Sequence, residues 1–130
     1  MTYSTTPAYN GSILHTLFSF EGRCTRLDFW LKGFIIGKIL FILAFTLPQP
    51  SWPEGMDTLV FVPIVILGIW IELAVSVKRF HDRGHAGGYV LFSFIPLANI
   101  IVFIQLGFLD GVHGANLYGQ DPKGRAQVTS

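Results

Sequence analysis

Two short segments of the chain combine arginines with a carboxylate and aromatic residues. Arg23 and Arg26 lie in the first segment, and Arg79, Asp82 and Arg83 lie in the second. An arginine guanidinium is a planar fork that binds a phosphate or a carboxylate bidentately. We therefore expect these residues to bind lipid head groups or a protein partner, and Asp82 to pair with one of the arginines inside the molecule.

Histidines beside the second segment raise two further kinds of chemistry. His81 and Asp82 could form an acid–base dyad, but adjacent residues on a helix point about 100° apart. A metal site would have only His81, Asp82 and His85, because His113 is expected on the opposite face of a membrane, and catalytic zinc needs three protein ligands of suitable geometry. We predict no catalytic residues, no metal and no cofactor. An enzyme acting on a lipid or phosphate ester through His81 and Asp82 stays open as a lower-ranked alternative.

The chain has a single cysteine, Cys24. One cysteine excludes a disulfide framework and a cysteine-based metal cluster. Its position next to Arg23 leaves palmitoylation or a lowered thiol pKa open, but we expect an inert small residue.

The composition limits the environment in which this chain can fold. Of its 130 residues, 51% are hydrophobic and only 13% are charged, and the mean hydropathy is +0.51. Soluble domains carry about a quarter charged residues, and a domain this small needs polar residues to cover its surface. The composition therefore argues strongly against a soluble globular domain, and it excludes a disordered chain, which requires low hydrophobicity. The formal net charge of +1 gives no reason to expect a nucleic-acid partner.

Three apolar runs, residues 27–47, 59–77 and 89–109, are the elements that would position these side chains. A helix needs about 20 residues to cross the roughly 30 Å hydrocarbon core of a bilayer, and in hydrocarbon every backbone polar group must be paired within the chain. The sequence thus predicts an all-α fold, a small polytopic membrane protein with three transmembrane helices. The single integral membrane domain covers residues 1–130, with a short N-terminal and interfacial segment at 1–26 and a polar C-terminal tail at 110–130.

An interfacial segment, two prolines and a pair of glycines refine this prediction. Leu17–Arg26 is either a short interfacial helix or an ordered lead-in loop. Pro63 falls near the start of the second run, where its missing N–H costs little, whereas Pro96 predicts a kink inside the third run. Gly33 and Gly37 have a small-xxx-small spacing that permits close contact between helices.

Lysines and arginines predict the orientation of the chain, because they concentrate on the cytoplasmic side of membrane spans. Six of them lie before the first run, at its start or between the second and third runs, and two lie in the tail. The sequence therefore predicts a multi-pass protein of the inner (plasma) membrane with its N-terminus in the cytoplasm and its tail outside. If the third run were re-entrant, the tail would return to the cytoplasm and meet both arginine segments.

Among the polar residues within the apolar runs, five are candidates for an intramembrane role: Lys32, Lys38, Glu72, Asn99 and Gln105. At about 1.5 Å of rise per residue, Lys32 and Glu72 lie at the same level, roughly 7–8 Å inside the boundary, so we expect them to pair. Lys38 and Asn99 lie deeper. Such residues either fix helix packing or form a polar path. The first interpretation is favoured, and the second makes the protein a subunit of a small-solute or ion transporter that uses Lys38, Glu72 and Asn99.

Three motifs give the sequence a specific resemblance. The first consists of Phe20, Gly22, Arg23, Arg26, Phe29 and Trp30; the middle one of Arg79, His81, Asp82, Gly84 and Gly87; and the tail motif of Gly114, Asn116, Tyr118, Gly119, Asp121 and Pro122. In order and spacing they resemble the bacterial domain of unknown function 805 (DUF805) family, the YhaH-like inner membrane proteins. The chain departs from the usual pattern at Phe80 and Tyr89. The resemblance implies a small multi-span bacterial inner membrane protein and implies no known reaction.

These observations favour an integral inner membrane protein that is not an enzyme. Its arginine-rich cytoplasmic face would bind membrane lipids, anionic ones in particular, or a protein. A homo-oligomer or a membrane protein partner is expected, and nucleic acid is not.

Overall fold

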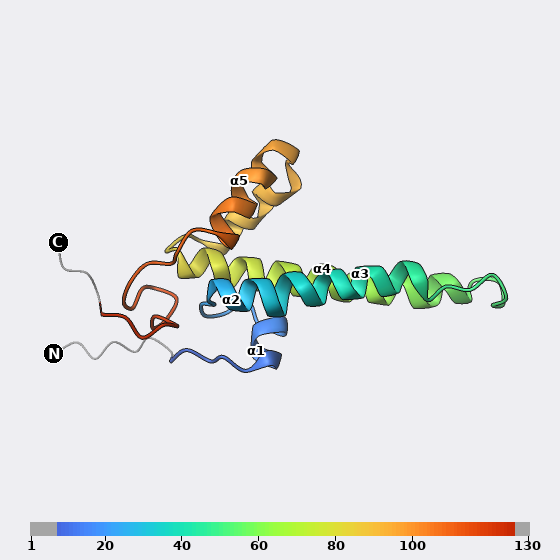
Figure 1. Ribbon diagram of the computed structural model, residues 1–130, viewed down its shortest axis with the longest axis horizontal. Helices are drawn as coiled ribbons and strands as arrows, with labels where there is room; N and C mark the ends of the chain where they lie inside the picture. The colour runs from blue at the N-terminus through green and yellow to red at the C-terminus, as the bar shows by residue number, and fades with distance from the viewer. Residues whose placement is uncertain (1–7, 127–130) are drawn as a thin grey trace.

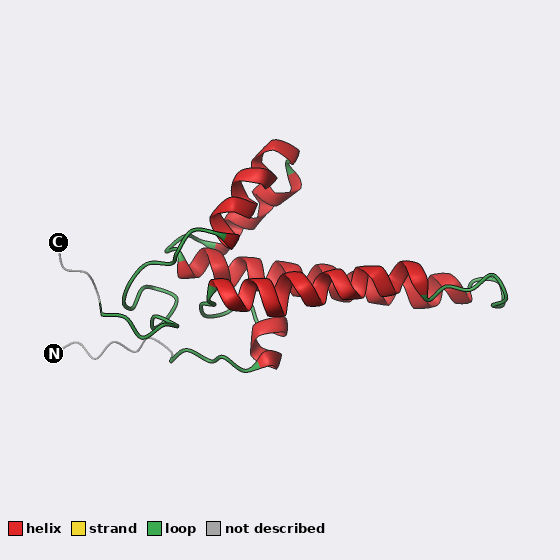
Figure 2. Cartoon of the chain, in the orientation of Figure 1, coloured by secondary structure: helices red, strands yellow, loops and turns green. Residues whose placement is uncertain are grey.

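The computed structural model describes residues 8–126, and all regular secondary structure in that range is helical, with no strand (Figure 2). In chain order the helices are α1 (Ile13–Phe18), α2 (Arg26–Asp28), the π-helix η1 (Phe29–Ile35), α3 (Ile36–Thr46), α4 (Met56–Asp82), the 3-10 helix η2 (Gly87–Phe94) and α5 (Pro96–Gly107). The all-α prediction is confirmed.

Two long apolar helices lie side by side along the longest axis of the molecule (Figure 1). The first is Arg26–Thr46, in which α2, η1 and α3 follow one another without a break, and the second is α4. Their 21 and 27 residues correspond to about 32 and 40 Å of helix, enough to cross a hydrocarbon core of about 30 Å. The structure is thus that of a small polytopic membrane protein. The helix α4 begins before residue 59 and continues past residue 77, so Pro63 lies inside it.

The two long helices approach closely where the sequence places Gly33 and Gly37. A Cβ atom at Gly33 would lie 2.7 Å from a methyl group of Val75, and one at Gly37 would lie 2.8 Å from the Glu72 carboxylate. Real Cβ contacts are longer, so these positions need glycine for the observed spacing. The expected role of the glycine pair as a close-contact surface is confirmed.

The helix α1 precedes the first long helix and ends at Phe18, before most of the predicted interfacial segment. Residues 19–25 form an irregular connection, which fits the lead-in loop better than a helix over Leu17–Arg26. Lys78 of α4 holds the end of α1 in place. Its buried ammonium donates hydrogen bonds to the carbonyl of His15, at 2.6 Å, and to that of Thr16.

The third apolar run does not form the continuous helix expected over 89–109. It is divided into η2 and α5, which pack on each other as a short hairpin that diverges from the long helices (Figure 1). Pro96 causes the break, because it has no N–H to donate and its ring excludes a helical residue before it; Ile95 is extended, with φ −97° and ψ 119°. Pro96 is therefore the first residue of α5 rather than a kink within a span.

The hairpin brings the tail back to the end of the long-helix pair marked by Arg26 and Asp82, which we call the clamp end. There Val112 donates its backbone N–H to the carbonyl of Asp82 at 2.9 Å. The expectation that the tail and the N-terminal segment lie on opposite faces is therefore wrong. The return of the tail to the N-terminal segment is the arrangement expected if the third run were re-entrant.

Reporter fusions would test this arrangement. A reporter joined after Ser130 should have the same sidedness as one joined to the N-terminus, whereas a reporter inserted at Trp52, in the loop between α3 and α4, should have the opposite one. Paired reporters that are active only in the cytoplasm or only in the periplasm give the measurement. A C-terminal reporter that matched the Trp52 insertion would contradict the hairpin.

Candidate functional site

A buried carboxylate with two arginines lies at the clamp end. Arg23 donates from Nε to Asp82 Oδ1 at 3.0 Å, and Arg79 donates from Nη1 to Asp82 Oδ2. Arg23 and Arg79 are only 4% and 0% exposed. We call these three residues the arginine clamp. The expectation that Asp82 pairs with an arginine inside the molecule is confirmed.

Backbone carbonyls accept further hydrogen bonds from both arginines, so that each guanidinium nitrogen has a partner inside the molecule. Arg23 donates to Gly114 O at 2.6 Å and to Val112 O at 2.7 Å. Arg79 donates to Leu106 O at 2.8 Å and to Leu109 O. A buried charge is tolerated when such partners satisfy it. The clamp thus ties the start of the first long helix, the end of α4, the end of α5 and the tail together, and both forks face inward in the structure.

The middle and tail motifs meet beside the clamp. The His81 ring is stacked on Tyr118, with 3.9 Å between ring centroids and 2° between planes. His81 Nδ1 lies 3.0 Å from Gly22 O, and Asn116 Nδ2 donates to His81 O at 2.8 Å. Within residues 8–126 no hydrogen bond joins His81 to Asp82, so the structure assembles no acid–base dyad from them.

Four glycines of the motifs have positive φ angles that favour glycine, and two of them, Gly22 and Gly84, flank the long helices. Gly22 has φ +90° and Gly84 has φ +79°, a left-handed region that other residues enter at a cost. They turn the chain before the first long helix and after α4. Nearby, Trp30 Nε1 donates to Gly107 O at 2.9 Å, which holds the end of α5 against η1.

A second ionic cluster fixes the tail at the surface. Asp121 is buried and accepts from Arg125 Nε at 2.8 Å, while exposed Asp110 accepts from Lys123 and Arg125, each at 2.7 Å. Burial alone would raise the pKa of Asp121, but the Arg125 hydrogen bond holds that pKa below its ordinary value. The Lys123 hydrogen bond likewise lowers the pKa of Asp110. Pro122 follows the buried carboxylate in the turn.

Cys24 is buried, and its Sγ lies 3.5 Å from Val75 O. Burial raises the pKa of its thiol to about 12, so the thiol stays neutral. This environment fits the inert residue expected from the sequence, and not an activated thiol.

An open groove lies between the start of the first long helix, the end of α5 and the tail, with a volume of about 510 Å³. Its walls include Leu27, Trp30 and Phe108, and its cations are Arg26 and Lys123. Arg26 donates to Phe108 O at 2.8 Å and its side chain is 42% exposed; that of Lys123 is 34% exposed. We call this the basic groove. Arg83 lies apart from it, donating to Gln105 O at 3.3 Å.

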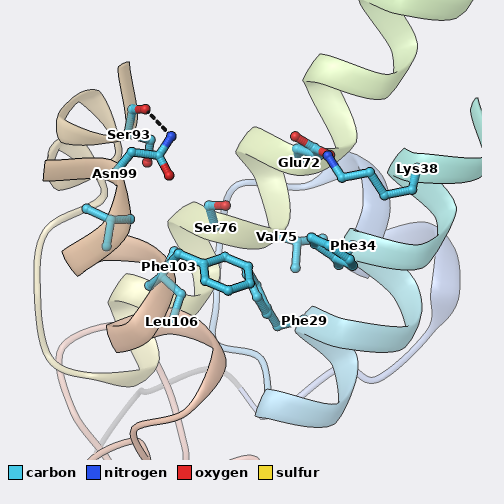
Figure 3. Close-up of a pocket in the computed structure, with 12 residues that line it drawn as sticks. Phe29, Phe34, Lys38, Glu72, Val75, Ser76, Ser93, Asn99, Phe103 and Leu106 are labelled. Atoms are coloured by element: carbon cyan, nitrogen blue, oxygen red, sulfur yellow. Dashed lines mark hydrogen bonds and ion pairs between the residues drawn. The ribbon is translucent and has the colours of Figure 1, made fainter. Parts of the chain in front are cut away.

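A smaller cavity of about 200 Å³ lies between the hairpin and the long helices (Figure 3). Three of the five intramembrane polar residues line it, namely Lys38, Glu72 and Asn99. Gln105 lines a different pocket, with Phe80 and His85. We call the cavity lined by Lys38, Glu72 and Asn99 the membrane cavity.

The predicted pair of Lys32 and Glu72 is wrong. Lys38 Nζ lies 3.1 Å from Glu72 Oε1, whereas Lys32 pairs with Asp28, one helical turn earlier, at 2.7 Å. The sequence-based depth of Glu72 was counted from residue 77, but α4 continues to Asp82, so Glu72 lies about 7.5 Å deeper than expected and is not level with Lys32. Glu72 packs over Gly37, and Lys38 is the next residue.

Within the part of the chain that the structure describes, no group of three or more His, Cys, Asp or Glu side chains could hold a metal ion. His113 lies at the clamp end, not on the opposite face, but its side chain is exposed and His85 is exposed on another loop. Sequence reasoning missed Lys78, Asp110, Lys123 and Arg125 as positioning residues. Their alternating charges in the tail, and Lys78 beside Arg79, were the available signals.

Comparisons with known proteins agree with this architecture. A family model described as "Protein of unknown function (DUF805)" matches residues 17–120. Inner membrane protein YhaI of Escherichia coli strain K12 is 31% identical over 119 residues, covering 86% of this chain and 92% of that protein. Uncharacterized protein YiiR of the same strain is 30% identical over 136 residues, covering 85% and 90%. No solved structure matches. The apolar helices and these relatives support an inner membrane location, and the chain belongs to the DUF805 family of proteins of unknown function.

Proposed function

We propose that this protein is a non-enzymatic inner membrane component whose basic groove binds the phosphate of an anionic lipid head group. The observation that carries this proposal is the exposure of Arg26 and Lys123 around a hollow of about 510 Å³. Arg23 and Arg79 are buried and bonded to partners inside the molecule, so they are not available to a ligand. Of the arginines predicted to bind head groups, Arg26 is therefore the one that this role uses.

The walls of the basic groove suit the membrane interface. Trp30, Leu27 and Phe108 present apolar and aromatic surface beside the two cations, which matches a ligand with a charged head and apolar chains. Near an anionic leaflet each lysine or arginine contributes about 1 kcal/mol to binding. Asp110 lies 3.9 Å from Arg26 Nε and also accepts from Lys123, so it holds both cations at the groove.

The proposed orientation has the clamp end and the N-terminus in the cytoplasm. With the tail at the clamp end, Lys123 and Arg125 add to the basic residues there, while the loop 47–55 between α3 and α4 contains no lysine or arginine. The charge difference between the two ends therefore favours this orientation more strongly than sequence counting did.

Lipid retention during native mass spectrometry tests the proposal. The purified protein should retain phosphatidylglycerol in preference to phosphatidylcholine, and the double variant Arg26→Ala/Lys123→Ala should bind it at least about tenfold more weakly, the loss expected for two interfacial cations. Arg83→Ala is the control, because it removes a cation of the same end that does not line the groove. Equal retention of the two lipids, or an equal loss in Arg83→Ala, would refute the groove as the site.

A second candidate is a subunit of a small-solute or ion transporter. What supports it is that Lys38, Glu72 and Asn99 line one cavity. Two long helices cannot enclose a path alone, so this role needs a homo-oligomer or a membrane protein partner. Crosslinking in native membranes that captured only the monomer would contradict it.

A further inference from the structure

The membrane cavity holds charged groups at a depth where hydrocarbon would surround them. Lys38 lies about 18 Å along the first long helix from Arg26, and Glu72 lies about 15 Å along α4 from Asp82. Yet the side chains of Lys38 and Glu72 are 50% and 45% exposed. Polar groups exposed at the middle of a bilayer are costly unless they face a partner or a cavity. A polar occupant of the membrane cavity would remove this cost.

We propose that the membrane cavity binds the neutral, oxygen-bearing head of an amphiphile whose apolar tail lies in the bilayer. This inference does not rest on the basic groove, because the two sites share none of the residues named for either. It also differs from the transporter interpretation, because the ligand enters from the lipid and stays bound.

The charge of the site selects a neutral head. The Lys38 ammonium lies 3.1 Å from the Glu72 carboxylate, so the pair has no net charge. It also lies 5.2 Å from the centre of the Phe34 ring, which holds it at the cavity. An ionised phosphate would be buried in hydrocarbon without a counter-ion of its own, which is strongly unfavourable.

The polar groups of the cavity suit carbonyl or hydroxyl oxygens. Figure 3 shows Ser93 and Asn99 on the hairpin side, Lys38 and Glu72 on the long-helix side, and Ser76 between them. Asn99 Nδ2 donates to the carbonyl of Ser93 at 2.6 Å, which fixes the amide. The ammonium and the serine hydroxyls are donors that a ligand oxygen can accept from.

The remaining walls suit a ring or a glycerol-sized group joined to a tail. Phe29, Phe34, Phe103 and Leu106 line the cavity on the side nearer the clamp end. A cavity of about 150 Å³ holds benzene, so the observed 200 Å³ accepts a somewhat larger head. The cavity is open on one side, which leaves the apolar tail of the ligand a way out to the surrounding lipid.

Two membrane constituents share this chemistry, a quinone with an apolar tail and a diacylglycerol. Native mass spectrometry with a decyl-substituted benzoquinone, dioctanoylglycerol and dioctanoyl phosphatidate separates them. We expect the protein to retain one equivalent of the quinone or of the diacylglycerol saturably, and the preferred one identifies the source. Phosphatidate should not compete for this site.

Matched variants connect the binding to the cavity. Ser76→Ala/Asn99→Leu should weaken retention about tenfold, the effect of losing one to two hydrogen bonds, while Thr46→Val, which removes a hydroxyl outside the cavity, should not. Glu72→Gln leaves Lys38 uncompensated and should shift preference towards phosphatidate. The circular dichroism spectrum and elution volume check that each variant is folded, and Arg26→Ala/Lys123→Ala should leave this binding unchanged.

Several results would overturn the proposal. They are no saturable retention of either neutral amphiphile, unchanged retention in Ser76→Ala/Asn99→Leu, and phosphatidate bound as tightly as the neutral ligands by Arg26→Ala/Lys123→Ala, in which the basic groove has lost its cations. A crosslink through a cysteine at position 76 or 99 to a second copy of the chain would also overturn it, because a partner subunit would then cover the cavity.

Discussion

Replacing Asp82 with alanine is expected to remove a large part of the stability of the folded protein. The variant would leave Arg23 and Arg79, which are 4% and 0% exposed, without a counter-ion, and breaking a buried ion pair in this way costs about 3–5 kcal/mol. A whole domain is stable by only about 5–15 kcal/mol. Size-exclusion chromatography of the detergent-solubilised protein after heating should show a strongly lowered midpoint of thermal unfolding, or no monodisperse protein.

Asp110→Ala is the matched control for this prediction. It also removes a carboxylate that contacts Lys123 and Arg125, but Asp110 is exposed and surface pairs contribute about 0–1 kcal/mol. Its effect should be small and should decrease further at high salt. If Asp82→Ala and Asp110→Ala shifted the midpoint equally, the clamp would not be the main support of the clamp end.

Gly111→Ala is expected to damage the same structure through steric overlap. A Cβ atom at Gly111 would overlap the Asp82 carboxylate and lie 2.8 Å from the backbone oxygen of Asp82. Neither group can move freely, because Arg23 and Arg79 hold the carboxylate and the Val112 N–H bonds the backbone oxygen at 2.9 Å. Overpacking of this kind costs about 1–3 kcal/mol, and displacement of the carboxylate would add to it. The same heating assay measures the loss.

Gly68→Ala provides a control with the opposite expected sign. Gly68 lies inside α4, and the nearest atoms to a new Cβ are 3.8 and 3.9 Å away, which is ordinary contact. Alanine is favoured over glycine by about 0.5–1 kcal/mol inside a helix, so this variant should be as stable as the unmodified protein or more so. If Gly111→Ala unfolded at the same temperature as the unmodified protein, the tail would not pack on Asp82 as described.

The residues by which the chain resembles its family largely hold the fold. Arg23 comes from the first motif, His81 and Asp82 from the middle motif, and Asn116 and Tyr118 from the tail motif, and together they form one network at the clamp end. A network of this kind accounts for the spacing of the motifs without any ligand. The ligand sites that we propose depend instead on side chains outside that network.

The sequence by itself determined that the chain folds in a lipid bilayer, that its fold is all-α, and where the two long helices lie. Length and hydropathy suffice for this, because a bilayer requires about 20 apolar residues in a fully hydrogen-bonded helix. It also indicated that Gly33 and Gly37 face another helix and that Asp82 pairs with an arginine. These are consequences of residue type and of spacing within one element.

Only the tertiary structure decided the fate of the third apolar run, the position of the tail and the partner of Glu72. The depth of a side chain depends on where its helix ends, and the apolar run ended at residue 77 whereas α4 ends at Asp82, so Lys32 was preferred over Lys38. The contacts that bury Arg23 join it to residues 59 to 96 positions away. The contacts with Val112, Gly114 and Gly119 exist only once the hairpin has returned the tail to the clamp end, an arrangement that no local pattern encodes.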